Sequence, residues 1–427
     1  MNPGGPADHI TPYDRLALPE RALIELLAAP DPHAGLLDYF GAVLYTQLTT
    51  LARESLRPRS APGRRVYVLP GIMGSQLGFG RGEHRPNDVV WLDPIDISFG
   101  RLAELRLGGA SPVLTLGAMN YSYLKLTLAL RVAGYDAVLL DYDWRHDIAS
   151  LGKLLAQRIA REGHDNVALI GHSMGGLVAR AALVHEGAAR VTRLVMLGTP
   201  NAGSLAAVQA LRGTYSVVRK IAQIDLRHDA EHLATQVFST FPGLHELLPA
   251  SRAIGDLDLF DAASWPSGPG PASELLSAAA GLDQRMAAPD QRFTMVVGCN
   301  RATATRLALR DGEFEYEYTL DGDGTVPMSL AQLPGAHNAY VDCGHSDMPL
   351  ADEVIHGTLD LLEAPATPRF ASEPTARPDT VIRVRDSGLR ALFNGKVDWP
   401  HMTPAQRREF LDTLNEPPWA AKRGLDP

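Results

Sequence analysis

Apolar runs and amphipathic segments alternate through the middle of the chain. Val167–Ile170 is a short apolar run typical of a strand that is buried on both faces, and Gly176–Val184, just after it, has apolar residues at helical spacing. Alternating strands and helices require right-handed crossovers, so the pattern predicts an α/β fold with a mostly parallel central sheet and helices on both faces. The other predicted strands are Arg65–Pro70, Ala137–Leu140, Arg193–Leu197, Arg292–Gly298, Phe314–Leu320 and Ala339–Cys343, and helices are expected over Tyr121–Val132, over Ser150–Arg161 and up to Leu362.

The two ends of the chain depart from this alternation. Residues 1–63 read as an N-terminal helical extension, with helices expected over Glu20–Leu27 and Leu36–Leu56. Residues 364–427 read as a proline-rich linker and a C-terminal extension, with a short strand expected at Val381–Val384 and a helix that begins at Thr403-Pro404. The central domain is therefore placed at residues 64–363, and the sequence suggests no function for the C-terminal extension.

Two insertions interrupt the central domain. In residues 76–109 no regular structure is predicted, although apolar residues crowd together there. An apolar loop beside a catalytic turn suggests a lid, in which Trp91, Leu92 and Phe99 would contact substrate; the alternative is a loop packed down as core. Helical pieces over residues 204–290 suggest a cap.

Composition limits the class of protein. The chain has 427 residues, 45% hydrophobic and 21% charged, as in ordinary globular proteins, and its net charge of −9 argues against nucleic acid as a partner. Cys299 and Cys343 are the two cysteines, which gives no disulfide framework or thiolate metal site and favours buried free thiols. The N-terminus lacks the pattern of a secretory signal, and no apolar run is long enough to span a bilayer, so a cytoplasmic location is expected.

The chemistry is concentrated where the central strand meets its helix. Gly171-His-Ser-Met-Gly175 follows Val167–Ile170 directly, and strand, G-x-S-x-G and helix together make a nucleophile elbow. Such a turn exposes the hydroxyl of Ser173 above the sheet and directs the N–H of Met174 at the position of a developing oxyanion. The glycine turn Gly71–Ser75, after an earlier strand, is expected to supply the second N–H, from Ile72.

A serine nucleophile needs a base and an acid that orients it, in the chain order serine, acid, histidine on this fold. Ser173, Asp323 and His345 satisfy this order, and each follows a predicted strand. Asp321 is nearly as good a candidate for the acid, with Asp323 preferred because it stands just before the chain turns. His337 and Asp347 are the other rivals, and their positions relative to the last strand favour structural roles.

The central domain also carries short motifs in a fixed order. They are Pro70–Leu77, Tyr142–Arg145, Gly171–Gly176, Gly198–Pro200, Phe241–Pro249, Asp323–Val326 and His345. Together they resemble the lecithin:cholesterol acyltransferase-like family of α/β-hydrolases, which includes lysosomal phospholipase A2 and the phospholipid:diacylglycerol acyltransferases. The resemblance implies acyl transfer from a lipid or other hydrophobic ester, with a lid over residues 76–109. The secreted relatives have disulfides that this chain lacks, and its two extensions fall outside the match.

The sequence therefore predicts a serine-dependent acyl-ester hydrolase or acyltransferase, with Ser173, Asp323 and His345 as the triad and no metal or organic cofactor. A hydrophobic ester or lipid is the expected substrate, with peripheral membrane contact possible and no protein partner suggested. Two alternatives remain: a peptidase or amidase with the same triad, and a non-catalytic scaffold that binds a protein partner.

Overall fold

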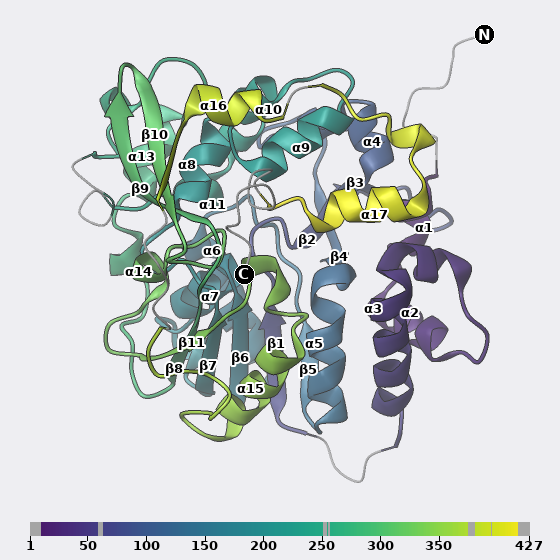
Figure 1. The fold of residues 1–427 in the computed structure, drawn as a ribbon. Helices are drawn as coiled ribbons and strands as arrows, with labels where there is room; N and C mark the ends of the chain where they lie inside the picture. Colours follow the sequence, from purple (N-terminus) through teal and green to yellow (C-terminus); the bar gives the residue numbers. More distant parts are fainter. Residues whose placement is uncertain are drawn as a thin grey trace.

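The structure is a computed structural model that describes residues 10–58, 63–250, 254, 257–374, 381–393 and 395–416. Its centre is a six-stranded sheet in the order β11-β8-β7-β6-β1-β5 (Figure 1). All five pairings are parallel. The strands are β1 Arg65–Leu69, β5 Asp136–Leu139, β6 Val167–His172, β7 Val191–Leu197, β8 Phe293–Gly298 and β11 His337–Val341.

Helices cover both faces of this sheet. They are α5 Asn120–Val132 and α15 Asp352–Glu363 on one face, and α6 Ile148–Glu162 and α7 Met174–Ala182 on the other. Alternate residues of β1 point to opposite faces: Val66 packs with Leu126 of α5, while Leu69 belongs to the apolar cluster around α6 and α7. Because both faces are buried, the strands have continuous apolar sequences. The predicted α/β-hydrolase fold is confirmed.

The segment predicted as an irregular loop is regular. It contains β2 Ser75–Phe79, β3 Asp88–Trp91, the helix α4 Pro94–Ser98 and the 3-10 helix η2 Arg101–Leu105. With β4 Leu114–Ala118, the two strands form an antiparallel sheet in the order β3-β2-β4. The prediction was wrong because these strands have only four or five residues and a register shift between Leu77 and Gly78, so no alternation is visible in the sequence.

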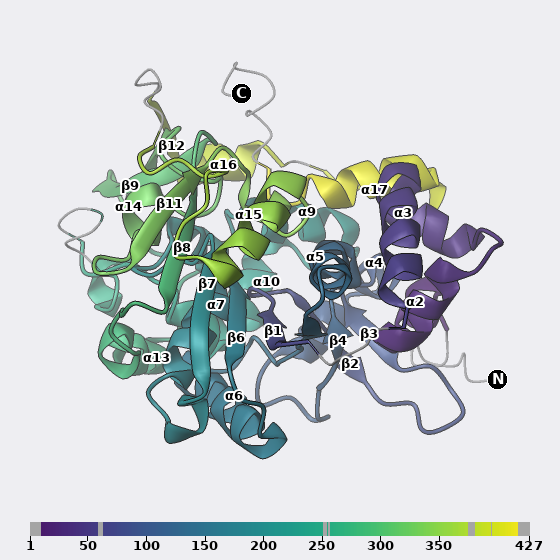
Figure 2. The same ribbon diagram turned by 90° about the horizontal axis from the view of Figure 1, so that it is seen from below.

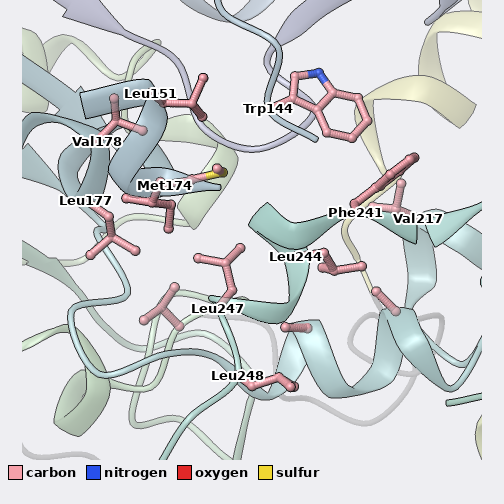
Figure 3. Packing of buried hydrophobic residues seen from close by; sticks show 14 of the residues in the cluster. Trp144, Leu151, Met174, Leu177, Val178, Val217, Phe241, Leu244, Leu247 and Leu248 are labelled. Atoms are coloured by element: carbon pink, nitrogen blue, oxygen red, sulfur yellow. The ribbon is translucent and has the colours of Figure 1, made fainter. Parts of the chain in front are cut away.

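Helices between β7 and β8 form the insertion predicted as a cap. They are α8 Leu205–Leu211, α9 Ser216–Ile224, α10 Ala230–Gln236, α11 Pro242–His245 and α13 Ser273–Ala279. Figure 3 shows Phe241 and Leu244 of this insertion beside Trp144, which precedes α6. The rings of Phe241 and Trp144 meet edge to face with 5.6 Å between centroids. Two motifs that lie far apart in the sequence are thus joined in one apolar core.

A second small sheet lies beside the central one. Its strands, in the order β12-β10-β9, are β9 Thr303–Arg310, β10 Glu313–Thr319 and β12 Ile382–Arg385, and the helix α16 Asp386–Ala391 follows β12. The buried side chains of Arg212 and Asp386 form an ion pair at 2.8 Å, which ties the C-terminal extension to α8. The strand β9, which the sequence did not predict, has an exposed outer half.

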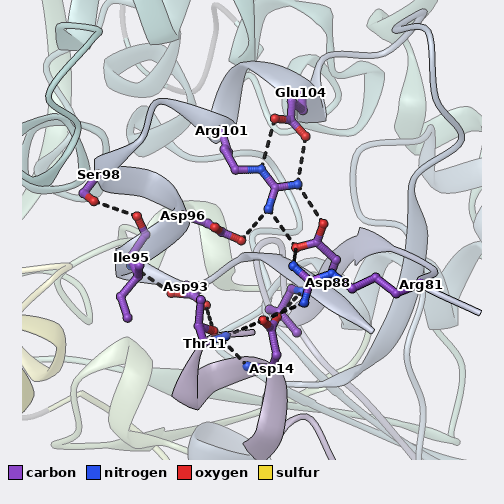
Figure 4. Close-up of polar contacts among 11 residues, drawn as sticks. Thr11, Asp14, Arg81, Asp88, Asp93, Ile95, Asp96, Ser98, Arg101 and Glu104 are labelled. Atoms are coloured by element: carbon purple, nitrogen blue, oxygen red, sulfur yellow. Dashed lines mark hydrogen bonds and ion pairs between the residues drawn. The ribbon is translucent and has the colours of Figure 1, made fainter. Parts of the chain in front are cut away.

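The N-terminal extension packs on the central domain. Its helices are α1 Pro12–Leu16, α2 Glu20–Ala28 and α3 Ala34–Ser55, and α3 lies along α5 (Figure 2). Figure 4 shows a buried polar network that fixes α1 to the β3–η2 region. In it, Asp14 accepts a hydrogen bond from the N–H of Val89 at 2.9 Å and pairs with Arg81 at 2.9 Å, and Arg81 pairs in turn with Asp88 at 2.8 Å.

The C-terminal extension ends in the helix α17 Pro404–Asp412, preceded by the 3-10 helix η8 Trp399–His401. Thr403 and Gln406 form the capping box that begins α17. The helix lies beside α3 in both views (Figures 1 and 2). Beyond it, the carbonyl of Thr413 accepts a hydrogen bond from Lys220 of α9. The C-terminal segment therefore bridges from the N-terminal helices to the helical insertion.

Two further expectations concern membranes and thiols. In the described part of the chain, no helix combines the length and the apolar character needed to cross a bilayer. Cys299 and Cys343 are both buried and unpaired with each other, which confirms the prediction of free thiols.

Candidate active site

Ser173 stands at a sharp turn between β6 and α7. Its φ of 53° and ψ of −129° are unusual for a residue other than glycine, and they indicate backbone strain held by the surrounding structure. The neighbouring glycines make the turn possible, because a Cβ at Gly175 would lie 2.5 Å from the carbonyl oxygens of Leu69 and Pro70. A Cβ at Gly171 would likewise lie 2.5 Å from the backbone of Gly176. Only glycine fits these positions.

The acid and base candidates are in contact. Nδ1 of His345 lies 2.7 Å from Oδ2 of Asp323, and both side chains are buried. The other carboxylate oxygen of Asp323 accepts hydrogen bonds from the N–H groups of Thr325 at 2.9 Å and Val326 at 2.7 Å. The backbone N–H of His345 also donates to the carbonyl of Asp323 at 2.8 Å. The carboxylate is therefore held in place and can fix the tautomer of His345 that leaves Nε2 as the proton acceptor.

Ser173 and His345 line the same cavity, which has a volume of about 890 Å³. Among the described residues no hydrogen bond joins their side chains. Catalytic serine–histidine contacts are often loose without substrate and tighten when it binds. The predicted nucleophile and the predicted base therefore share one cavity.

The rival residues lie elsewhere. Asp321 is exposed, and its carboxylate contacts the hydroxyl of Thr319 at 3.2 Å rather than a histidine. His337 begins β11 and is exposed at the opposite end of the sheet from His345. Asp347 lies one short turn after His345 in the 3-10 helix η7 His345–Asp347 and lines the cavity without contacting the imidazole.

The glycine turn predicted to hold the oxyanion lies against the elbow. A Cβ at Gly71 would come within 2.8 Å of Cβ of Ser173, so this backbone approaches the nucleophile closely. The N–H of Gly71 donates to the hydroxyl of Tyr123 at 2.9 Å, and the next residue, Ile72, lines the cavity. Met174 is the first residue of α7, where the N–H has no intrahelical acceptor. The assignment of the N–H groups of Ile72 and Met174 to an oxyanion hole stays a prediction.

A chain of hydrogen bonds connects this turn to the histidine loop. The Tyr123 hydroxyl lies 2.8 Å from Nδ1 of His172, and Nε2 of His172 lies 2.9 Å from the carbonyl oxygen of His345. The directions are fixed at both ends, because an N–H can only donate and a carbonyl can only accept. Tyr123 must donate to His172, whose ring is neutral; burial, and next the proximity of His345, lower the pKa of His172 to about 3.

Of the three residues predicted to contact substrate, two line the cavity. Trp91 is only 3% exposed, its Nε1 donates to the carbonyl of Met73 at 2.8 Å, and its ring meets that of Trp144 edge to face. Leu92 is half-buried in the cavity wall. Phe99 is 45% exposed and lies outside the wall, because it follows the last turn of α4 and points to solvent. The structure does not bring it into the cavity wall, and its role as a substrate contact stays a prediction.

The two extensions contribute to the cavity wall, which the sequence did not indicate. The cavity wall includes residues of α1, α3 and α17 as well as the helical insertion. The capping box at Thr403 signals a helix, yet nothing in the sequence indicates where that helix docks. Tyr123 was also missed, since a tyrosine within an amphipathic helix gives no signal of its own. Among the described residues, no group of three or more His, Cys, Asp or Glu side chains could hold a metal ion.

Comparisons with known proteins find a family model and several similar solved structures. Residues 145–249 match the model of the PGAP1-like alpha/beta domain, which spans the elbow and the first part of the helical insertion. No curated protein matches the chain. Solved structures that are similar include the mature lipase BlEst2 of Bacillus licheniformis, with 14% identity, coverage of 72% of this chain and 94% of that one, and a TM-score of 0.36. The Tle4–Tli4 complex matches with 12% identity, coverage of 71% and 99%, and a TM-score of 0.42.

A third similar structure is the phospholipase PlaB of Legionella pneumophila, with 12% identity, coverage of 72% of this chain and 60% of that one, and a TM-score of 0.31. At these identities and scores, the similarities do not assign a substrate. The fold is that of the α/β-hydrolases, a fold that does not by itself fix the reaction.

Proposed function

We propose that this protein is a serine-dependent acyl-ester hydrolase or acyltransferase that acts on a hydrophobic ester. The observation that carries the proposal is the 2.7 Å contact of Asp323 with His345 in the same cavity as the strained Ser173. The motifs that resemble the lecithin:cholesterol acyltransferase-like family support a lipid-like acyl donor. No protein partner or cofactor forms part of the proposal.

In the first step, Oγ of Ser173 attacks the ester carbonyl carbon while Nε2 of His345 takes the hydroxyl proton. The negative charge on the carbonyl oxygen is stabilised by the N–H groups of Ile72 and Met174. The C–O bond to the alcohol then breaks, and the imidazolium of His345 protonates the departing oxygen. Asp323 stabilises the imidazolium throughout and stays ionised.

In the second step, the acyl group leaves Ser173. Water or an alcohol donates its proton to His345 and attacks the acyl carbon, and the Ser173 oxygen recovers the proton as the bond breaks. The apolar lining supports an acyl group with several methylenes, since each methylene buried contributes about 0.8 kcal/mol, close to fourfold in affinity. Leu92, Leu244 and Leu247 are among the apolar side chains in this wall.

Turnover of p-nitrophenyl esters from acetate to decanoate, compared with peptide amides, tests the proposal. We expect kcat/KM to rise with acyl length and amide turnover to be absent. Efficient cleavage of amides would instead establish a peptidase. Absence of both activities, with no labelling by an acyl-serine probe, would favour a scaffold.

A further inference from the structure

The terminal extensions take part in the catalytic cavity. Pro12, Tyr13, Arg15 and Leu16 around α1, and His33, Gly35, Asp38 and Tyr39 around α3, line the same space as Ser173. From the other end of the chain, residues between Pro404 and Glu416 line it as well. A cavity of about 890 Å³ is near the upper end of the usual range for ligand pockets, so it has room for more than a short acyl group.

The helix α17 packs against a kink in α3. Gly41 interrupts that helix with a φ of 74°, and a Cβ there would lie 2.9 Å from Nε of Arg408. Arg408 also donates to the carbonyl of Asp38 at 2.9 Å. Arg408 thus packs on the kink and binds a backbone carbonyl beside it, and the positive φ of Gly41 favours glycine at the kink.

The end of the C-terminal segment reaches the histidine loop. Asn415 donates from Nδ2 to the hydroxyl of Ser346, the residue after His345, and its Oδ1 accepts from the hydroxyl of Tyr215 at 3.0 Å. The hydroxyl of Tyr121, the second residue of α5, donates to the carboxylate of Asp412. Three hydroxyl groups therefore hold residues 412–415 beside the catalytic base.

This placement identifies which part of an ester faces the C-terminal segment. The imidazolium must protonate the departing alcohol, so that alcohol lies on the side of His345, while the acyl chain extends away from it. The side of His345 is the side held by Asn415 and Ser346. The helical insertion supplies the other apolar wall, with Leu244 and Leu247.

We propose that α1, α3 and residues 403–416 form the subsite for the alcohol part of the ester, and that this subsite selects bulky amphipathic alcohols. The inference rests on the proposed esterase function. Tyr13, Tyr39 and Tyr121 line the subsite and combine apolar rings with polar tips. Charged side chains of both signs lie among them: Arg15, Asp38, Arg407, Arg408 and Asp412. An alcohol with an apolar body and a polar end matches this lining, and the same subsite holds an acceptor alcohol in acyl transfer.

Two series of esters separate the subsites. In the alcohol series, butanoates of methanol and of 2-naphthylmethanol are compared; in the acyl series, methyl acetate and methyl octanoate. Ratios of kcat/KM within a series, taken relative to the wild type, cancel the intrinsic reactivity of each ester. Leu414→Ala alters the C-terminal wall, Leu244→Ala alters the wall of the insertion, and Glu409→Ala, on the exposed side of α17, is the matched control.

We expect Leu414→Ala to lower the naphthylmethyl-to-methyl ratio at least fivefold while the octanoate-to-acetate ratio stays within twofold. Leu244→Ala should do the reverse, and Glu409→Ala should change neither. A shift of the acyl ratio by Leu414→Ala, or no shift of either ratio, would overturn the subsite. Leu411→Ala, in the same wall, replaces Leu414→Ala if that variant has a lowered melting temperature.

Binding of 2-naphthylmethanol to the full-length Ser173→Ala protein provides a readout that needs no turnover. The subsite predicts saturable binding that Leu414→Ala weakens at least fivefold and Leu244→Ala leaves within twofold. If the wild type cleaved no ester while Ser173→Ala bound the alcohol with this pattern, the proposed function would be refuted, and only a binding site for the alcohol would remain. Ester turnover by the wild type without such binding would refute the subsite and leave the proposed function standing.

Discussion

The hydroxyl of Tyr123 lies 2.8 Å from Nδ1 of His172 and receives the N–H of Gly71 at 2.9 Å. These two side chains link the oxyanion turn to the loop of His345, since His172 continues the chain to the carbonyl of that residue. The turn and the base therefore have a common support, although they come from distant parts of the sequence.

Tyr123→Phe should lower kcat at least tenfold and leave KM within twofold. The change keeps the ring but leaves a buried N–H and a buried ring nitrogen unpaired, each of which costs about 1–3 kcal/mol. Steady-state kinetics and thermal melting measure both effects. Tyr135→Phe, far from the cavity, is the control for the loss of a tyrosine hydroxyl. A lowered melting temperature with unchanged kcat would show that the chain of hydrogen bonds is structural only.

Replacing each of the two candidate acids by asparagine should affect kcat very differently. Asp323→Asn should lower kcat about 10⁴-fold, as loss of the correct histidine tautomer does in a serine protease. Asp321→Asn should stay near the wild type because its carboxylate is exposed and contacts only Thr319. The same comparison applies to His345→Ala against His337→Ala. Measured kcat/KM for the four variants decides, and a reversed order in either pair would contradict the assignment.

Replacing Trp91 should mainly affect stability, whereas replacing Leu92 should mainly affect the preference for acyl length. Trp91→Ala should destabilise the protein by about 3–5 kcal/mol, because it empties a core position. It also removes the donor to Met73 of the oxyanion turn, so all acyl lengths should lose activity alike. Leu92→Ala should instead flatten the rise of kcat/KM with chain length. Melting curves and an ester series on both variants test this; a chain-length effect confined to Trp91→Ala would reverse the roles.

The network that holds α1 should be sensitive to pH. Burial raises the pKa of Asp93 from 3.8 to about 7, although the hydroxyl of Thr11 and the N–H of Ile95 bind its carboxylate and act in the opposite direction. Asp14 adds a repelling charge. An acid with a raised folded-state pKa favours the folded state most below its unfolded pKa. That contribution is lost as the pH rises from about 4 through about 7.

The wild type should therefore lose more stability than Asp93→Asn when the pH is raised from 5 to 8, because the asparagine cannot ionise. Urea unfolding at the two pH values gives the difference in the free energy of unfolding. Asp321→Asn, at an exposed carboxylate, should show no such trend. If the difference in the free energy of unfolding between the wild type and Asp93→Asn did not change with pH, Asp93 would be ionised throughout the range.

The strand–turn–helix at Ser173 could be predicted from the sequence because its signal is local, and the triad candidates were chosen by their places after predicted strands. Val167–Ile170 and the following G-x-S-x-G are contiguous, and Asp323 and His345 each follow a predicted strand. The choice of Asp323 over Asp321 is different: it depends on which carboxylate turns inward, and the two are separated by only Gly322. In the structure, the N–H groups of Thr325 and Val326 bind one oxygen of the Asp323 carboxylate, and the other oxygen contacts His345.

What could not be predicted is the docking of distant segments. The helix α17 contacts α3 through Arg408, which packs against Gly41. These two residues are 367 positions apart in the chain. Side-chain pairs of this kind leave no periodic pattern. The β3-β2-β4 sheet was missed for a related reason, since its short strands gain their stability from pairing rather than from local propensity.

Labelling with a fluorophosphonate probe tests the central claim most directly, because the probe forms a covalent bond only with an activated serine. Intact-protein and peptide mass spectrometry should find one probe per wild-type chain, on Ser173, and none on the Ser173→Ala protein at an unchanged melting temperature. Labelling that persists in Ser173→Ala, or a folded wild type that does not react, would contradict the assignment of Ser173 as the nucleophile.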